Sequence, residues 1–170
     1  GSGLFKAGFA NNESPHIVFK SYIGTPKYIK VHHNKKKDIY IGNEASVRAG
    51  LLNLKYPIQH GVVTNWDDLE TIWHYAFYNE LKINPEEHPI LISEVVNNPK
   101  SNREKMIQIM FETFHVPSYY TEIDAILSFY SSDCSDGIVL DVGNSVSKII
   151  PFHDYEVIKP AVNRMNIGGQ

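Results

Sequence analysis

The sequence has little of several features that would narrow its class at once. Its 170 residues contain one cysteine, Cys134, which excludes an internal disulfide framework and favours a reducing compartment. Its apolar runs are far too short to span a membrane, and no signal peptide is visible. The net charge of -3 gives no global attraction to nucleic acid or to an anionic membrane. We therefore expect a cytoplasmic or nuclear protein without membrane insertion and without a specific nucleic-acid partner.

Familiar catalytic motifs are also missing. The chain has no Ser-His-Asp grouping, no zinc-ligand spacing, no Walker loop and no nucleophile elbow. With 42% apolar and 21% charged residues, its composition is that of an ordinary globular protein that can bury a core. Function has to be sought in local patterns.

Residues 137–151 carry the pattern with the most chemistry. An apolar run ends on Asp141, small residues follow at 143–145, and a β-branched run begins at Val146. This pattern predicts a strand, a tight turn and a second strand. Small turn residues let backbone N–H groups approach an anion, and an aspartate ending a buried strand suits a metal–water cluster beside phosphates. An ordinary hairpin with an Asx turn explains the same residues, so both interpretations stand.

The start of the chain repeats this turn pattern. Residues 1–6 and 143–148 each hold three small residues, an apolar residue, one further residue and a lysine. Two phosphate-type turns in one chain suggest two hairpins that face one ligand. The repeat also favours residues 1–3 as native sequence over a cloning scar.

Apolar spacing predicts three helices. The first is expected to be capped by Thr64 with Asp67, and the second by Ser101 with Glu104. A third helix is predicted over residues 120–130, a range that includes Asp124.

Short strands are predicted over residues 16–22, 38–42 and 89–92. Residues 24–26 are expected to end the first of them. The tail from residue 154 contains the pair Gly168-Gly169, which is interpreted either as a turn near a nucleotide or as a plain loop.

Residues 27–37 form a basic segment with five lysines and two adjacent histidines. A solvated loop tip explains them better than a contact for an acidic partner or for phosphates. Tyr28 is the one aromatic ring of the Phe, Tyr or Trp type among these lysines, fewer than a nucleic-acid platform would require.

Longer strings in the chain resemble the actin family. They are Leu-Lys-Tyr-Pro-Ile-Gln-His-Gly (54–61), Val-Thr-Asn-Trp-Asp-Asp-Leu-Glu (63–70), Asn-Pro-Lys-Ser-Asn-Arg-Glu-Lys-Met (98–106) and Ile-Met-Phe-Glu-Thr-Phe (109–114). Residues 3–9 and 141–143 fit as well, so the match runs through the whole chain in register. It covers about the first half of an actin-family chain.

The resemblance implies an α/β fold of the actin-like ATPase (ribonuclease H-like) type. The fold would be incomplete here, with an outer lobe and the first hairpin of the inner lobe. Subdomain 1 would take residues 1–20 and 57–131, subdomain 2 residues 21–56 with the basic loop 27–37, and the start of subdomain 3 residues 132–170. ATP or ADP, with Mg²⁺ or Ca²⁺, would bind between two phosphate loops.

The resemblance also assigns residues to the nucleotide site. They are Ser2, Gly3, Leu4 and Lys6 in the first loop, Asp141, Gly143, Asn144, Ser145 and Val146 in the second, and Gly169 near the nucleotide. Asp141 would hold the metal through water. His60 matches a histidine that is methylated in many actins.

Several positions depart from the family pattern. Asn144-Ser145 stand in place of an Asp-Gly pair, Asp124 in place of a water-orienting glutamine, and Lys148 in place of an active-site histidine. A carboxylate at 124 either repels phosphate oxygens or acts as a stronger base. The family's first-loop aspartate would precede residue 1. We therefore expect doubtful nucleotide binding and weak or absent hydrolysis in this chain, with Asp124, Lys148 and Asp141 as the candidate catalytic residues.

The predicted parent role is cytoskeletal, either in filament assembly or as the fixed actin-like subunit of a complex. The expected partners are actin-like subunits or actin-binding proteins. Two alternatives remain open: a scaffold that never polymerises, and an ATPase with Asp124 as base and Lys148 as charge stabiliser. A third is a truncated product without independent function, whose hairpin 137–151 would expose an apolar face.

Overall fold

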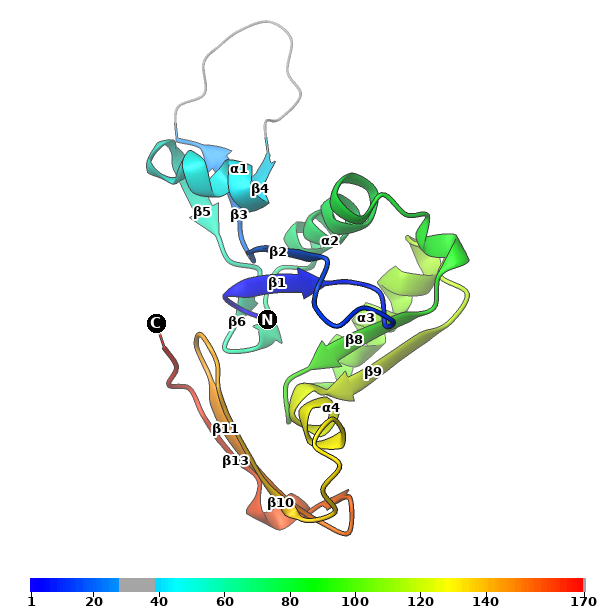
Figure 1. Cartoon of the computed structure of the whole chain (residues 1–170). Coiled ribbons are helices and arrows are strands. Elements are labelled where there is room, and N and C mark those ends of the chain that lie inside the picture. Colours follow the sequence, from blue (N-terminus) through cyan, green and yellow to red (C-terminus); the bar gives the residue numbers. More distant parts are fainter. Residues whose placement is uncertain (28–38, 170) are drawn as a thin grey trace, which may run out of the picture. The chain divides into compact units, whose positions relative to one another are not determined.

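The computed structural model describes residues 1–27 and 39–169 (Figure 1). The chain divides into two units: unit 1 holds Gly1–Gln59 and Val63–Ile83, and unit 2 holds His60–Val62 and Asn84–Gln170. Each unit contains both strands and helices, which agrees with the predicted α/β class. Within the described ranges, no helix combines the length and the apolar character needed to cross a bilayer.

Unit 1 is built from short antiparallel strands and two helical segments. Strand β1 (Leu4–Ala7) pairs with β2 (Ile17–Lys20), and β3 (Ile23–Pro26) pairs with β4 (Tyr40–Ile41) and β5 (Leu52–Lys55). Helix α1 (Gly42–Val47) and a 3₁₀ turn (Ala49–Leu51) lead from β4 to β5. After β6 (Ile58–Gln59) and β7 (Val62–Val63), helix α2 (Trp66–His74) continues into a π-helical segment (Tyr75–Leu81).

The core of unit 1 follows from strand alternation and helical spacing. In β2, Ile17 and Phe19 are buried while the residues between and after them are exposed. Phe19 stacks on Phe5 of β1 with ring centroids 4.9 Å apart, and Ile72 and Ala76 cover this cluster from the helix. The apolar residues that predicted helix α2 are therefore the ones that pack into the core.

Two local predictions in unit 1 were wrong. Helix α2 is capped by Asn65, whose side chain accepts a 3.0 Å hydrogen bond from the Asp68 backbone N–H. Thr64 instead donates its hydroxyl to the carbonyl of Pro57, so tertiary contact removes it from the cap. Residues 24–26 do not end a strand but form most of β3, because both neighbouring strands offer hydrogen bonds to it.

Unit 2 begins with a 3₁₀ turn (Pro85–Glu87) and a parallel strand pair joined by a helix. Strand β8 (Ile90–Glu94) leads through α3 (Lys100–Glu112) to β9 (Tyr119–Ile123), and α4 (Asp124–Tyr130) follows directly. The remaining strands are β10 (Gly137–Val142), β11 (Ser147–His153), β12 (Glu156–Val157) and β13 (Asn163–Met165), with a 3₁₀ turn at Lys159–Ala161. Strand β11 pairs with β10, β12 and β13, which lie along it in Figure 1.

The third predicted helix was wrong in its first half. Residues 119–123 form β9, in parallel register with β8, and only residues 124–130 are helical. The β-forming residues Tyr119, Tyr120 and Thr121 satisfy their backbone groups on a strand that lies far away in sequence. Periodicity within 120–130 could not reveal that partner.

The predicted cap of the second helix was also wrong. Helix α3 begins at Lys100 behind Pro99, with no side-chain cap, so Ser101 lies inside its first turn. Its apolar face was predicted correctly, since Met106, Ile109 and Met110 are buried.

The hairpin 137–151 is confirmed, and it extends to His153. On β11, Ile150 and Phe152 are buried and belong to a core cluster of unit 2. Strand β10 was expected to be buried, but one of its faces is not: Ile138 is 70% and Leu140 65% exposed. The tail supplies strands β12 and β13, neither of which was predicted from the sequence.

Candidate functional site

The turn between β10 and β11 is held from within and from the tail. The N–H of Gly143 donates to the carbonyl of Val146 at 2.9 Å, which closes the turn. The N–H of Gly169 donates to the carbonyl of Gly143 at 2.9 Å, and the Ser147 hydroxyl donates to the carbonyl of Ile167 at 2.7 Å. The structure thus brings Gly169 against the second predicted phosphate loop.

Gly168 makes the closest approach to this turn. A Cβ atom at Gly168 would lie 2.5 Å from the backbone carbonyl of Asn144 and from the backbone nitrogen of Ser145. Real Cβ atoms essentially never come that near, so the two backbones can pass only because Gly168 lacks a side chain. The pair Gly168-Gly169 is therefore part of the turn's architecture rather than a plain loop.

His60 and Arg164 fasten the same region to the rest of unit 2. The Nδ1 atom of His60 lies 3.1 Å from the carbonyl oxygen of Ser145. Because a carbonyl only accepts, Nδ1 carries the hydrogen in this contact. Arg164 donates to the carbonyl of His60 at 2.7 Å and to that of Val96 at 3.2 Å. His60 is therefore held by hydrogen bonds at both its ring and its carbonyl.

Arg164 was missed by the sequence analysis. Its partners lie 104 and 68 positions away along the chain, so no local pattern contains them. A basic residue a few positions before a glycine pair was the only available signal, and many loops share it.

Lys148 joins the other two candidate catalytic residues in one cluster. Asp141 stands directly opposite Lys148 in the β10–β11 register, and its Oδ2 atom lies 2.7 Å from Lys148 Nζ. Lys148 Nζ also donates to Asp124 Oδ2 at the start of α4. The lysine side chain is 4% exposed, whereas those of Asp124 and Asp141 are 37% and 41% exposed.

Lys148 occupies a buried position of β11, on the same side of the strand as the core residues Ile150 and Phe152. A buried ammonium group has to be paired, and here two carboxylates pair with it. The cluster carries one positive and two negative formal charges. Both carboxylate oxygens of Asp124 are engaged, because Oδ1 accepts from the N–H of Ala125 at 2.9 Å.

The residues predicted for the first loop lie in unit 1. Leu4 and Lys6 belong to β1, and the carbonyl of Gly3 accepts a 3.1 Å hydrogen bond from the N–H of Ser21. Lys6 is exposed. Because the second loop belongs to unit 2, the shared ligand between the two loops stays a prediction.

Glu94 is the last residue of β8. Its side chain is 5% exposed, and Arg103 contacts it at 2.6 Å while Asn98 donates to it at 2.8 Å. The hydrogen bond to Glu94 raises the pKa of Arg103 above its usual value. These contacts tie the end of β8 to α3, so the geometry supports a structural role.

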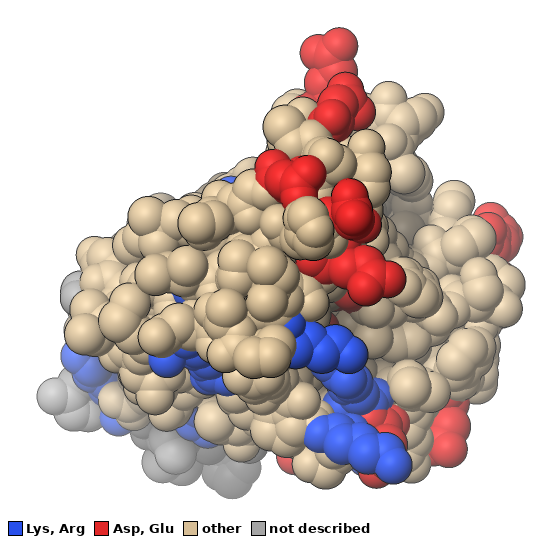
Figure 2. Space-filling model, turned by 90° about the horizontal axis from the view of Figure 1, so that it is seen from below, with Lys and Arg blue, Asp and Glu red and all other residues tan. Residues whose placement is uncertain are grey.

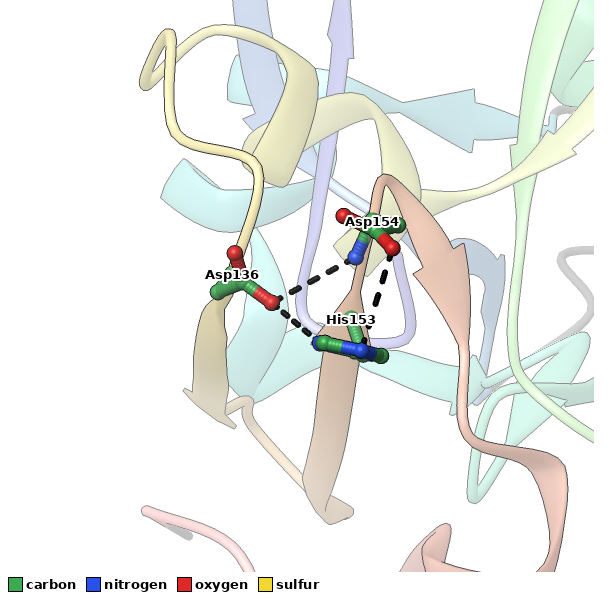
Figure 3. A group of neighbouring side chains, drawn as sticks. All are labelled: Asp136, His153 and Asp154. Atoms are coloured by element: carbon green, nitrogen blue, oxygen red, sulfur yellow. Dashed lines mark hydrogen bonds and ion pairs between the residues drawn. The ribbon is translucent and has the colours of Figure 1, made fainter.

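A third charged group lies on the surface at the far end of the β10–β11 hairpin (Figure 3). Asp136, His153 and Asp154 hold side-chain atoms of metal-ligating type within 4.8 Å of one another. However, His153 Nδ1 is only 2.5 Å from Asp136 Oδ1, which is hydrogen-bond contact, whereas two ligand atoms about 2 Å from a tetrahedral metal lie roughly 3.3 Å from each other. Asp136 also accepts from the N–H of Asp154 at 3.4 Å, so the group closes the β11–β12 turn.

Figure 2 shows both basic and acidic side chains on one face of the molecule. Most of the described surface on that face belongs to other residues. Most of the basic segment 27–37 lies outside the described residues. Of its members, Lys27 is described, and its ammonium group donates to the carbonyl of Gly50 at 2.9 Å.

One comparison with known proteins bears on this geometry. A protein-family model described as Actin matches residues 1–170, the full length of the chain. The match includes the β10–β11 turn, the glycine pair packed on it and the Lys148 cluster. The chain therefore belongs to the actin family.

Proposed function

We propose that this chain is the nucleotide-binding part of an actin-family cytoskeletal protein that hydrolyses ATP slowly. Actin-family proteins generally bind ATP or ADP with a divalent cation, are typically cytoskeletal and cytoplasmic, and interact with actin-like or actin-binding partners. In this proposal the chain keeps the nucleotide site and the partners of its family. It assembles into a filament or serves as a fixed actin-like subunit of a complex.

The observation that carries the proposal is the backbone packing at the β10–β11 turn. Gly168 lies so close to the backbone of Asn144 and Ser145 that only glycine fits there, and the Gly169 N–H donates to the carbonyl of Gly143. Such a fixed, small-residue turn is suited to present backbone N–H groups to phosphate oxygens. The predicted binding residues Gly143, Asn144 and Ser145 lie in this turn.

Slow hydrolysis follows from the chemistry of the Lys148 cluster. Asp124 replaces the family's water-orienting glutamine, and both of its oxygens already accept hydrogen bonds. A carboxylate held in this way is a poor general base, because a base must reach the proton it removes. This argues against the alternative ATPase in which Asp124 is the base.

The binding test is calorimetry with ATP and with ADP on the full chain, compared with the Gly168→Ala variant. We expect binding to the unaltered chain and at least about tenfold weaker binding to the variant, equal to about 1.4 kcal/mol. No binding of either nucleotide to the unaltered, folded chain would overturn the proposal.

Two further assays test the finer statements. Phosphate release at the rate of an actin with full activity would contradict slow hydrolysis, and loss of turnover in Asp124→Asn would restore Asp124 as the base. Sedimentation at high speed separates the two assembly roles, since a filament subunit pellets and a fixed subunit does not.

A further inference from the structure

Actin-family proteins generally bind their nucleotide together with a divalent cation. The residues of unit 2 show whether such a cation fits beside the β10–β11 turn. Mg²⁺ and Ca²⁺ take oxygen ligands, mostly carboxylates, carbonyls and water. Asp124 and Asp141 are the carboxylates that lie together beside the turn. An oxygen of each contacts Lys148 Nζ, so an ammonium group already stands where a cation between them would stand. A divalent ion does not fit there without removal of Lys148.

We propose that Lys148 is a built-in cation that takes the place of a divalent metal ion between Asp124 and Asp141. The cation itself is a property of the folded chain. Its consequence for nucleotide binding rests on the proposed function: the site needs no divalent ion at Asp141. This differs from the sequence-based expectation that Asp141 holds a metal through water.

The lysine cannot leave its position as a dissolved ion can. Its strand is hydrogen-bonded on both sides, with Asp141 opposite it on β10 and Arg164 opposite it on β13. Its side chain is 4% exposed and shares the core-facing side of β11 with Ile150 and Phe152. An ammonium held by a covalent stem is present at any metal concentration, so chelators do not remove it.

The two carboxylates, in contrast, are open to the solvent. Their side chains are 37% and 41% exposed, so a hydrated ion can reach them once the ammonium is gone. Removal of the lysine charge leaves two neighbouring carboxylates, which is the start of an oxygen-ligand site. The proposal therefore predicts that a variant gains a metal site that the unaltered chain lacks.

The first experiment is calorimetric titration of the full chain with Mg²⁺ and with Ca²⁺, without nucleotide. The Lys148→Met variant keeps the length and the apolar stem of the side chain and loses its charge. We expect it to bind one ion at least about tenfold more tightly than the unaltered chain does, or about 1.4 kcal/mol. The double variant Lys148→Met/Asp141→Asn should lose this gain. Lys159→Met, which removes an exposed lysine of the same unit, should bind as the unaltered chain does.

The unaltered chain provides a test that does not depend on how the variant folds. Carboxyl ¹³C signals of Asp124 and Asp141 should not move when millimolar Mg²⁺ is added. Saturable shifts of both signals, or stoichiometric binding that Asp141→Asn abolishes, would overturn the proposal. A folded Lys148→Met variant without any gain in metal binding would overturn it too.

The nucleotide consequence has its own readout. ADP affinity of the unaltered chain should change less than about twofold between excess EDTA and excess Mg²⁺, whereas the affinity of Lys148→Met should become metal-dependent. If neither chain binds ADP, the proposed function fails, while the metal titrations still decide the role of Lys148. A strong Mg²⁺ requirement in the unaltered chain that Asp141→Asn removes would contradict the built-in cation.

Discussion

Two charged clusters of unit 2 differ in which member is buried: the acidic residue in one and the basic residue in the other. At the end of β8 the carboxylate of Glu94 is 5% exposed, and the guanidinium of Arg103 that pairs with it is 42% exposed. On β11 the ammonium of Lys148 is 4% exposed, and its two aspartates are more than a third exposed. The first cluster balances its charges, while the second has one carboxylate in excess.

This difference in burial determines which charged partner a dissolved ion or water can replace. A buried ion depends on its protein partner, because water cannot take the partner's place. An exposed ion exchanges its partner for water at small cost. The buried carboxylate of Glu94 is therefore destabilising without Arg103. The exposed carboxylates of Asp124 and Asp141 can be hydrated without Lys148 and can bind another cation. Four substitutions in unit 2 test these contacts.

Arg103→Met should have the largest effect. It leaves Glu94 buried with the amide of Asn98 but without a counter-charge, and we expect a loss of about 3 kcal/mol in the free energy of unfolding. Urea unfolding followed by circular dichroism measures it. Lys105→Met on the same helix, where the lysine is exposed, is the control and should change little. Equal effects of the two variants would show that burial of Glu94 does not matter.

Gly168→Ala should come second. The added methyl group meets backbone atoms at 2.5 Å and forces the β10–β11 turn to move, which should cost about 2 kcal/mol. Gly50→Ala is the matched control, because a Cβ there has no neighbour within 4 Å. Thermal unfolding of both variants checks the prediction. If the two melt alike, the close approach at the turn carries no strain.

Lys148→Met should cost less stability than Arg103→Met, although both remove a cation. The aspartates that lose their partner are partly hydrated, so we expect a loss of about 1 kcal/mol. The measurement is urea unfolding in EDTA, so that no metal replaces the lysine. A loss as large as that of Arg103→Met would remove the distinction between the two clusters.

His153→Gln should have the smallest effect, one that depends on pH. The hydrogen bond that His153 donates to Asp136 raises the pKa of His153 above 6.5. The stabilisation is therefore fully present below pH 6.5 and is lost as the pH rises through the raised pKa. The same contact, after a stronger one from Ser135, lowers the pKa of Asp136, whose own contribution is lost only at acid pH. Unfolding of both chains at pH 5.5 and 8.5 should show a difference only at the lower pH. A difference that grows toward pH 8.5 would contradict this sign.

Local patterns predicted much of the fold and part of the candidate site. The buried faces of α2 and α3 and the β10–β11 hairpin were accessible, because each depends on spacing within a short stretch. The role of the glycine pair was left open between a turn and a plain loop. The caps of both helices and the strand β9 were not accessible. Thr64 bonds to the carbonyl of Pro57, which lies outside the helix, and residues 119–123 pair with β8. Both partners override the local preference.

The chain's residue pattern was enough to indicate two strands about a small-residue turn. The family resemblance added Asp141 as a match and Asp124 and Lys148 as departures. It could not reveal that these three meet. Lys148 contacts Asp124 across 24 positions, and it is buried because β11 lies between β10 and β13. Tertiary structure alone made the lysine a buried cation, since burial and pairing are properties of neighbours in space rather than of neighbours in sequence.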